Sequence, residues 1–282
     1  MLQIAIPNKG SLSEGTVELL REAGYRCKRS GRELMVTDKK HEIEFIFLRP
    51  RDIAVYVNNG VLDLGITGRD LVLDSQADVI ETLPLNFGNS AFYYALPNES
   101  DKLPDDFGGL TIATSYPNIV KGDLAARNVD AKIVRLDGAV EISIRLGVAD
   151  VIADVVESGR TLKEAGLKVV GEPILQSEAV IIARDQATIE KSEVKQLLRR
   201  VRGILVARSY AMIEYDIPRD NLEQACEITP GIESPTIAPL SNPDWVAVKS
   251  MILQKESNAV MDDLHDAGAR GIIVTDIRTC RI

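Results

Sequence analysis

The hydrophobic positions of the chain fall into short runs, and most of these runs are followed by a polar turn and then by a segment with helical periodicity. Leu2–Ile6 is an apolar run of strand length, and Ser13–Ala23 repeats apolar residues at the spacing of an amphipathic helix. Alternation of strands and helices predicts an α/β fold. Further strands are expected at Glu44–Leu48, Leu62–Ile66, Leu83–Leu96, Thr111–Ala113, Lys132–Leu136, Val148–Val156, Lys168–Ile174 and Ala179–Ala183, and further helices at Ile53–Asn58, from Leu71, and at Lys121–Arg127, Val140–Leu146, Thr161–Ala165 and Asp185–Val201.

The order of these segments predicts two lobes. The strand-like run Leu83–Leu96 has small residues at its start and is interpreted as the crossover into a second lobe. Ala179–Ala183 could return the chain to the first lobe. A chain that leaves one α/β lobe, builds another and returns encloses a cleft between them, and the turns at the strand ends would line it.

The pattern changes from about Arg202. Alternating strands and helices over this part give the order βαββαβ, which is typical of a ferredoxin-like module. One sheet face of such a module stays open, so a partner or a second copy from another subunit is expected there. The strands are expected at Ile204–Tyr215, Pro235–Leu240, Trp245–Leu253 and Gly271–Ile277, and the helices at Arg219–Cys226 and Ser257–Ala267.

The segment Gly147–Gly166 combines a buried strand, a turn of small residues and the start of a helix. Ser158 or Thr161 would cap the helix and Gly166 would end it. Free backbone N–H groups at a helix start attract phosphate, and both hydroxyls could complete that site. Asp154, at the strand end, would then accept hydrogen bonds from sugar hydroxyls. An ordinary strand–turn–helix unit without a ligand remains the alternative, and the segment lacks the G-K-[ST] ending of a Walker loop.

Cationic side chains recur where strands of the first lobe end. Lys9, Arg49 with Arg51, and Arg69 with Asp70 each follow a predicted strand and precede a helix. Because ligands of open α/β sheets bind at this edge, the three turns predict a positive cleft. A solvated lysine and arginines paired with neighbouring aspartates are the alternatives.

Two further side chains are candidates in the second lobe. Tyr116 follows the strand Thr111–Ala113, where its ring could stack on a base or pack within the lobe. Glu141 is expected on the first turn of the Val140–Leu146 helix, near enough in sequence to assist Asp154 with a ribose.

Composition and charge narrow the classes of function. The 282 residues carry 33 Lys and Arg against 42 Asp and Glu, a net charge of −9, which argues against non-specific nucleic-acid binding. Cys27, Cys226 and Cys280 are widely spaced, which disfavours a disulfide framework and a zinc site. Only two histidines are present, which disfavours Ser-His-Asp catalysis. The N-terminus shows no signal-peptide pattern, and no run approaches a membrane span, so a cytoplasmic protein is expected.

Several motifs together resemble the long form of the ATP phosphoribosyltransferase family, the first enzyme of histidine biosynthesis. The motifs are PNKGSL at 7–12, FLRPRDI at 47–53, DLGITGRDL at 63–71, RLDGAVEISIRLGVADVIADVVESGRTL at 135–162 and ITPGIESPTIAPL at 228–240. The resemblance covers nearly the whole chain and implies two lobes with the fold of type II periplasmic binding proteins, followed by a ferredoxin-like, ACT-like regulatory domain. Its expected divisions are 1–90 with 184–201 for lobe I, 91–183 for lobe II and 202–282 for the regulatory domain.

The resemblance also implies a reaction and its sites. Adenine N1 of ATP would displace pyrophosphate from C1 of 5-phosphoribosyl 1-pyrophosphate, with Mg²⁺ carried by the substrates and no metal ligand from the protein. Asp154, Lys9 and Arg49 would be catalytic; Asp154, Val155, Val156, Glu157, Ser158, Gly159, Arg160, Thr161 and Glu141 would bind the phosphoribosyl donor; Gly68, Arg69, Asp70 and Tyr116 would border the nucleotide. Glu157 departs from the small residue common in the family and must point away from phosphate.

Regulation and assembly are implied as well. L-Histidine would inhibit by binding the C-terminal domain at Asp216, Ile232, Ser234, Thr236 and Gly271, AMP would be a further inhibitor, and the chain would form a hexamer built from dimers. The chemistry of the Ile228–Thr236 turn allows an amino-acid site or a rigid connector. Two other functions remain open: a solute-binding protein, which should carry an export signal, and a pure amino-acid sensor, which would leave the cationic turns unexplained.

Overall fold

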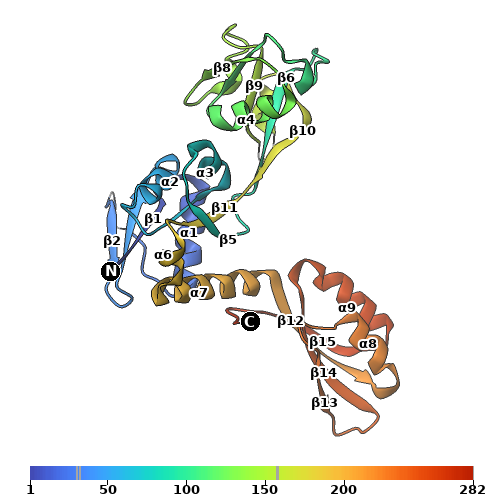
Figure 1. Ribbon diagram of the computed structural model, residues 1–282. Coiled ribbons are helices and arrows are strands. Elements are labelled where there is room, and N and C mark those ends of the chain that lie inside the picture. Colours follow the sequence, from blue (N-terminus) through green and yellow to red (C-terminus); the bar gives the residue numbers. More distant parts are fainter. Residues whose placement is uncertain (30, 32, 157–158, 282) are drawn as a thin grey trace. The chain divides into compact units, whose positions relative to one another are not determined.

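The computed structural model describes residues 1–29, 31, 33–156 and 159–281, and it divides into two compact units, Met1–Lys195 and Gln196–Ile282. The first unit contains a six-stranded and a five-stranded sheet, and the second contains a four-stranded sheet (Figure 1). Among the described residues, no helix has the length and apolar character needed to cross a membrane.

The six-stranded sheet forms lobe I. Its strands lie in the order β2-β3-β1-β4-β11-β5, with β1 parallel to β3 and β4, and with β11 antiparallel to both β4 and β5. Ile4, Ala5 and Ile6 of the central strand are at most 1% exposed, which explains the continuous apolar run. The strands are β1 (Leu2–Pro7), β2 (Met35–Asp38), β3 (Ile43–Leu48), β4 (Leu64–Gly68), β5 (Ile80–Pro84) and β11 (Ala179–Ala183).

The five-stranded sheet forms lobe II, in the order β10-β6-β9-β7-β8. The strand β7 is parallel to β8 and β9, whereas β6 is antiparallel to β9 and β10. Its core includes Phe92, Tyr94 and Phe107, all fully buried. The strands are β6 (Ser90–Pro97), β7 (Thr111–Thr114), β8 (Lys132–Arg135), β9 (Val151–Val156) and β10 (Leu167–Ser177).

The two sheets share one strand order. Lobe I reads β3-β1-β4-β11-β5 and lobe II reads β8-β7-β9-β6-β10, so each follows 2-1-3-n-4, where n is the strand that arrives from the other lobe. Two crossings, after β5 and after β10, therefore join the lobes. This topology is the fold of type II periplasmic binding proteins and confirms the predicted fold class.

Helices begin directly where the parallel strands end. β4 ends at Gly68 and α3 begins at Arg69, and similar short turns join β1 to α1 and β3 to α2. The carboxyl ends of parallel strands meet at one sheet edge, so the intervening side chains are gathered there. The helices of this unit are α1 (Gly10–Glu22), α2 (Pro50–Asn58), α3 (Arg69–Ser75), α4 (Pro117–Arg127), α5 (Arg160–Glu164) and α6 (Gln186–Glu190), and α7 (Ser192–Ser209) runs from this unit into the next.

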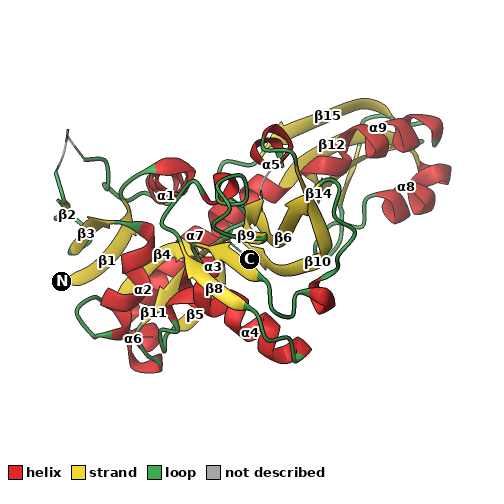
Figure 2. Ribbon diagram, turned by 90° about the horizontal axis from the view of Figure 1, so that it is seen from above, coloured by secondary structure: helices red, strands yellow, loops and turns green. Residues whose placement is uncertain are grey.

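The second unit has the predicted βαββαβ order. Its antiparallel sheet runs β13-β14-β12-β15, and α8 and α9 lie together beside it (Figures 1 and 2). Along β12, Ala211, Ile213 and Tyr215 are buried and alternate with half-buried residues, as expected of a sheet covered on one face. The elements are β12 (Tyr210–Pro218), α8 (Leu222–Ile228), β13 (Thr236–Pro239), β14 (Trp245–Leu253), α9 (Ser257–Asp266) and β15 (Arg270–Asp276).

Two expectations about the connection between the units were wrong. The predicted strand at Ile204–Tyr215 begins only at Tyr210, because α7 continues to Ser209. Leu197, Val201, Ile204 and Leu205 are buried at helical spacing, and a short apolar run cannot be assigned to strand or helix by its own composition. The predicted single helix Asp185–Val201 is also two helices, with the Asp185 carboxylate accepting from the Thr188 N–H at 2.6 Å as the cap of α6.

Other boundaries differ as well. The predicted helix Val140–Leu146 is only a 3₁₀ turn at Val140–Ile142, where the Ser143 hydroxyl donates to the Val140 carbonyl and competes with the backbone pattern. Leu83–Leu96 is divided between β5 and β6, and β2 was not predicted. Because β11 pairs with β4 and β5, lobe II ends near Glu178 rather than at residue 183, and the compact units divide at 195/196 rather than at 201/202.

Gly65 tests how closely α2 packs on β4. A Cβ atom there would lie 2.5 Å from the Ile53 Cγ2, closer than real Cβ atoms come, and in tight contact with Val57 at 3.1 Å and Ile182 at 3.3 Å. We expect Gly65→Ala to destabilise the first unit by about 1–3 kcal/mol through overpacking, seen as a lower midpoint of thermal unfolding. Gly122→Ala is the matched control, because its Cβ would meet nothing within 4 Å on α4 and should raise the midpoint slightly. Equal midpoints for the two variants would contradict the close approach.

Candidate active site

Cationic side chains from several strand ends line one cavity of about 510 Å³ in the first unit. Lys9 and Arg49 occupy the positions before α1 and α2, and Arg51 lies in the first turn of α2. Lobe II contributes Ser115 and Arg135, which follow and end its own strands β7 and β8. Three of the cations expected from sequence thus come together in the structure. The cavity is also lined by Pro50, Asp52, Leu71, Asp137 and Gly138.

Arg135 was missed from the sequence, although the signal was present. It ends β8, at the same kind of strand end that drew attention to the cations of lobe I. Its guanidinium donates to Asp137 at 3.3 Å, and both side chains are largely exposed. The criterion used for lobe I, a cationic side chain where a predicted strand ends, also identifies Arg135 in lobe II.

A second cavity of about 350 Å³ lies at the end of β9 and the start of α5. Asp154 and Glu141 share it, as the sequence predicted for a ribose site, and Gly159 and Thr161 lie at the start of the helix. Glu157 and Ser158, the remaining residues of the predicted phosphate loop, lie outside the described residues. The cavity is lined in addition by Ile152, Val155, Val156 and Leu162.

The start of α5 differs in detail from the prediction. Gly159 is the residue before the helix and has φ of 69°, a left-handed conformation that favours glycine. Thr161 lies inside the helix and therefore does not cap it, whereas Gly166 ends the segment with φ of 72° as expected. The Arg160 side chain is 85% exposed and pairs with Glu164 at 2.8 Å, so it points to solvent in this conformation.

Asp154 is a partly buried carboxylate whose surroundings, on balance, disfavour its charge. Its Oδ1 accepts from the N–H of Val155 at 2.8 Å. Burial raises the pKa of Asp154, and the nearby carboxylates of Glu141 and Asp70 act in the same direction, whereas the Val155 N–H and the Arg51 charge oppose the shift. A carboxylate in this state gains strongly from additional hydroxyl donors, as a sugar diol would provide.

Tyr116 lies at the centre of the polar contacts between the lobes. The Arg51 guanidinium carbon is 4.3 Å from the centre of its ring, and Phe92 packs edge-on against it at 5.2 Å. Burial and a hydrogen bond to the Asp70 carboxylate raise the pKa of the Tyr116 hydroxyl. Asp70 is itself held by Ser177, whose hydroxyl donates to the carboxylate at 2.8 Å and accepts from the Asp70 N–H at 3.0 Å.

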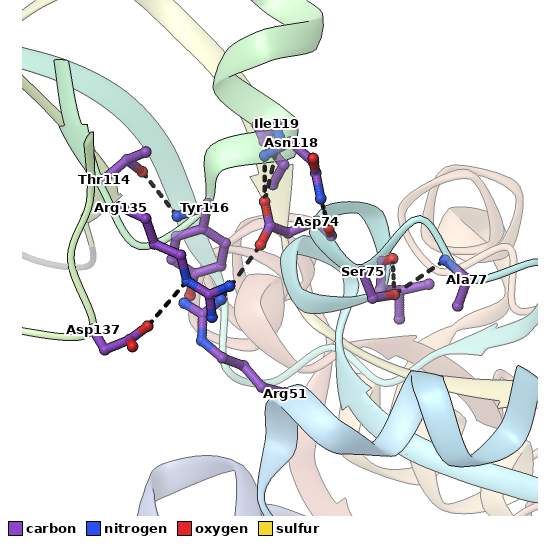
Figure 3. Close-up of polar contacts among 11 residues, drawn as sticks. Arg51, Asp74, Ser75, Ala77, Thr114, Tyr116, Asn118, Ile119, Arg135 and Asp137 are labelled. Atoms are coloured by element: carbon purple, nitrogen blue, oxygen red, sulfur yellow. Dashed lines mark hydrogen bonds and ion pairs between the residues drawn. The ribbon is translucent and has the colours of Figure 1, made fainter. Parts of the chain in front are cut away.

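Asp74 connects α3 of lobe I to the first turn of α4 in lobe II (Figure 3). Its Oδ1 accepts from the backbone N–H of Asn118 at 2.9 Å and of Ile119 at 3.4 Å, and its backbone carbonyl accepts from the Asn118 side chain at 2.7 Å. Its Oδ2 accepts from Arg51 at 3.4 Å. The amides at this helix start are therefore already occupied by a carboxylate of the other lobe.

Arg69 is the predicted cleft cation that the structure places elsewhere. Its guanidinium donates to Glu81 at 2.7 Å and to Glu178 at 3.3 Å, and these two carboxylates raise the pKa of Arg69. A role at substrate phosphates would require both ion pairs to break. Gly68 lies directly before it, where a Cβ atom would collide with the Asp70 carboxylate, so a larger residue would displace that side chain from Ser177.

The residues proposed for histidine lie in two groups of the second unit. Asp216 on β12 lies opposite Arg270 of β15 in the register of the sheet. Gly271, the residue after Arg270, has φ of 60°. Ile232, Ser234 and Thr236 belong to β13 and its preceding turn, and β14 separates β13 from β12. Strands two apart in a sheet are about 10 Å apart. The turn itself is anchored to the core, because the Ser250 hydroxyl donates to the Thr229 carbonyl at 3.0 Å.

Within the described part of the chain, no group of three or more His, Cys, Asp or Glu side chains is placed to hold a metal ion. Glu141 and Asp154 share a cavity, but two carboxylates fall short of the six oxygen ligands that Mg²⁺ prefers.

The raised pKa of the partly buried Asp154 predicts a gain in stability on its neutralisation. A raised pKa in the folded state means that the contribution of this group to stability is fully present below the ordinary pKa of aspartate and is lost as pH rises through the raised value. Asp154→Asn, which keeps the acceptor for Val155, should therefore raise the midpoint of thermal unfolding at neutral pH, with a difference that shrinks toward about pH 4. Asp78→Asn, at an exposed position, should show no such trend. A lower midpoint for Asp154→Asn at neutral pH would contradict the assignment.

Comparison with known proteins gives matches along nearly the whole chain. The ATP phosphoribosyltransferase family model matches residues 49–203, and the model of the C-terminal domain of the same family matches residues 207–279. The ATP phosphoribosyltransferase of Salinibacter ruber is 59% identical over 283 residues, and that of Pseudarthrobacter chlorophenolicus is 54% identical over 284 residues, each covering 100% of both chains.

A solved structure supports the same relationship. A chain in the ATP phosphoribosyl transferase (HisG:HisZ) complex from Thermotoga maritima matches with a TM-score of 0.62 and 28% identity, over 72% of this chain and 99% of that one. Full-length identity above half, together with matches in both units, shows that this chain belongs to the ATP phosphoribosyltransferase family.

Proposed function

We propose that the chain joins N1 of the adenine ring of ATP to C1 of 5-phosphoribosyl 1-pyrophosphate and releases pyrophosphate, the first step of histidine biosynthesis. The observation that carries the proposal is the presence of two unlike cavities in the first unit: one built on Asp154 and Glu141, the other on Lys9, Arg49 and Arg51. A sugar diol fits the first and phosphates fit the second. The family relationship supports the same reaction.

The β9–α5 cavity would hold the phosphoribosyl donor. Asp154 and Glu141 accept hydrogen bonds from the ribose hydroxyls, and the N–H groups around Gly159 and Thr161 receive the 5-phosphate. The loop residues assigned to this donor by sequence are Asp154, Val155, Val156, Glu157, Ser158, Gly159, Arg160 and Thr161. The acidic side of the cavity also favours the positive charge that develops on the ribose ring as the leaving group departs.

The cationic cavity would hold the pyrophosphate and triphosphate groups. Lys9, Arg49 and Arg51 stabilise negative charge as the bond from C1 to the pyrophosphate oxygen breaks, and Arg135 adds a further cation from lobe II. Mg²⁺ carried by the substrate phosphates would supply additional stabilisation of the leaving group.

Tyr116 and Asp70, with Gly68 beside them, would border the adenine. N1 of adenine attacks with its own lone pair, so positioning matters more than a strong base. The pair of electrons released from C1 leaves with pyrophosphate. The scarcity of histidine in the chain is then no obstacle to the reaction.

Regulation is proposed for the second unit. Its open sheet face carries Asp216, and the Ile228–Thr236 turn offers hydroxyls and backbone donors, a combination suited to the amino and carboxylate groups of L-histidine. L-Histidine bound there would inhibit transfer, and AMP would compete for the nucleotide side. The open face of this sheet also supports assembly of dimers into a hexamer, and the substrates ATP and phosphoribosyl pyrophosphate support a cytoplasmic location.

The reaction is tested by near-ultraviolet absorbance on mixing the full chain with ATP, phosphoribosyl pyrophosphate, Mg²⁺ and pyrophosphatase. We expect a signal that requires both substrates. Asp154→Ala should lower kcat/KM by roughly 10- to 100-fold, the loss of a charge-assisted hydrogen bond. Glu164→Ala is the matched control, because Glu164 is an exposed acid of neighbouring α5 whose partner is Arg160. Absence of signal from the folded wild type would overturn the proposal, and equal losses in both variants would overturn the role of Asp154.

The histidine site is tested by calorimetric titration of the full chain with L-histidine. We expect Asp216→Ala to weaken binding by roughly 10- to 100-fold, because an ammonium group would lose its charged partner. Glu214→Ala removes the same charge two residues earlier on β12, where Glu214 pairs with Lys249, and should leave the affinity nearly unchanged. If Asp216→Ala bound L-histidine with the affinity of the wild type, Asp216 would not be part of the L-histidine site.

A further inference from the structure

Asp74 occupies an unfavourable place on its own helix. It lies in the last turn of α3, Arg69–Ser75, where the helix dipole disfavours a negative charge. The residue is nevertheless buried, at 8% exposure. A buried carboxylate at the wrong end of its helix requires compensation from outside that helix.

The compensation comes from the other lobe and from Arg51. The first turn of α4 supplies the N–H groups of Asn118 and Ile119 to Oδ1, so the charge sits at the favourable end of that helix. The Asn118 side chain binds the Asp74 carbonyl, and the Arg51 guanidinium reaches Oδ2. Each polar group of Asp74 that can accept a hydrogen bond therefore has a partner among the described residues.

The two partners of the Asp74 carboxylate, the start of α4 and Arg51, both adjoin Tyr116. Tyr116 is the residue directly before α4, where its carbonyl accepts from the Val120 N–H at 3.3 Å, and its own N–H donates to the hydroxyl of Thr114, at the end of β7, at 2.9 Å. Its backbone is therefore held between β7 and α4. Arg51 covers its ring at 4.3 Å. Figure 3 shows Asp74 between these two elements, in contact with the guanidinium on one side and with the helix start on the other.

We propose that Asp74 is a positioning residue for the nucleotide side of the reaction: its carboxylate joins α3 to the first turn of α4 and holds Arg51 over Tyr116, so that the two side chains bordering the base keep their places. Asp74 itself touches neither substrate. The inference rests on the proposed function for its choice of ligand, but the contact between the lobes can be measured without any substrate.

Hydrogen exchange in the substrate-free full chain tests the contact. In Asp74→Ala, the amides of Asn118 and Ile119 should exchange about tenfold faster or more, because their acceptor is lost. Asp74→Asn retains an acceptor oxygen at Oδ1 without the charge for Arg51, and should show a smaller increase. The control is Asp78→Ala, which removes a carboxylate at an exposed position four residues on. Unchanged exchange in Asp74→Ala would overturn the proposal.

Steady-state kinetics of the same variants test the positioning role. Asp74→Ala should raise KM for ATP by about tenfold while KM for phosphoribosyl pyrophosphate changes by less than about twofold, with Asp74→Asn between wild type and alanine. A purely structural role would lower kcat through loss of folded enzyme and leave both KM values unchanged. Faster amide exchange with an unchanged KM for ATP would overturn positioning while leaving the proposed function intact. An inactive but folded wild type would instead overturn the proposed function, and the exchange experiment would still decide the contact.

Discussion

The Arg51 guanidinium is the cation shared by Asp74, Asp154 and the Tyr116 ring, whereas the nearby Asp70 carboxylate accepts from Ser177. Arg51 pairs with Asp74, stacks on the Tyr116 ring and opposes the rise in the pKa of Asp154. Like charges brought together away from water disfavour one another unless a cation or hydrogen-bond donors offset them. The acidic side of the site therefore depends on a cation supplied by lobe I. Loss of Arg51 would remove the ion pair of Asp74, the cation over the Tyr116 ring and the positive charge near Asp154.

The same region is tied to the crossings between the lobes. Glu178, between β10 and β11, accepts from Arg69 and also from the N–H of Asn86, which lies in the other crossing. The neighbouring Ser177 holds Asp70. Ser177 and Glu178 of one crossing thus contact Asp70 and Arg69, the two residues that follow β4. A shift of this crossing would therefore also move the Asp70 carboxylate.

The partly buried Asp154 carboxylate illustrates a general conflict between stability and function. Its surroundings raise its pKa, which means that the ionised form costs stability in the folded state. The cost is retained where a substrate that donates hydrogen bonds can offset it. Under the proposed ribose role of Asp154, a neutral replacement would fold better and bind the sugar less well, as expected where a site rather than the core determines the residue.

Local sequence determined most of the elements and the chemistry at their ends. Periodicity alone predicted β1, α1, β3 and the βαββαβ order of the second unit, because apolar spacing records which face of an element is buried. It also predicted that Lys9, Arg49 and Arg51 would share an edge, because parallel strands end on the same side of a sheet. The place of Asp154 at a strand end, with Glu141 nearby in the chain, also predicted that these two carboxylates would lie together, and they line one cavity.

Only the tertiary structure decided which of these side chains remain available. Arg69 resembled a cleft cation until Glu81 and Glu178, 12 and 109 residues away, were brought beside it. Asp74 and Asn118, 44 residues apart, showed no sequence signal of their contact. The apolar run after Arg202 fitted strand or helix equally, and burial on one side extended α7 through it. In each case the partner is distant along the chain, and local spacing carries no information about the element that tertiary packing will place opposite it.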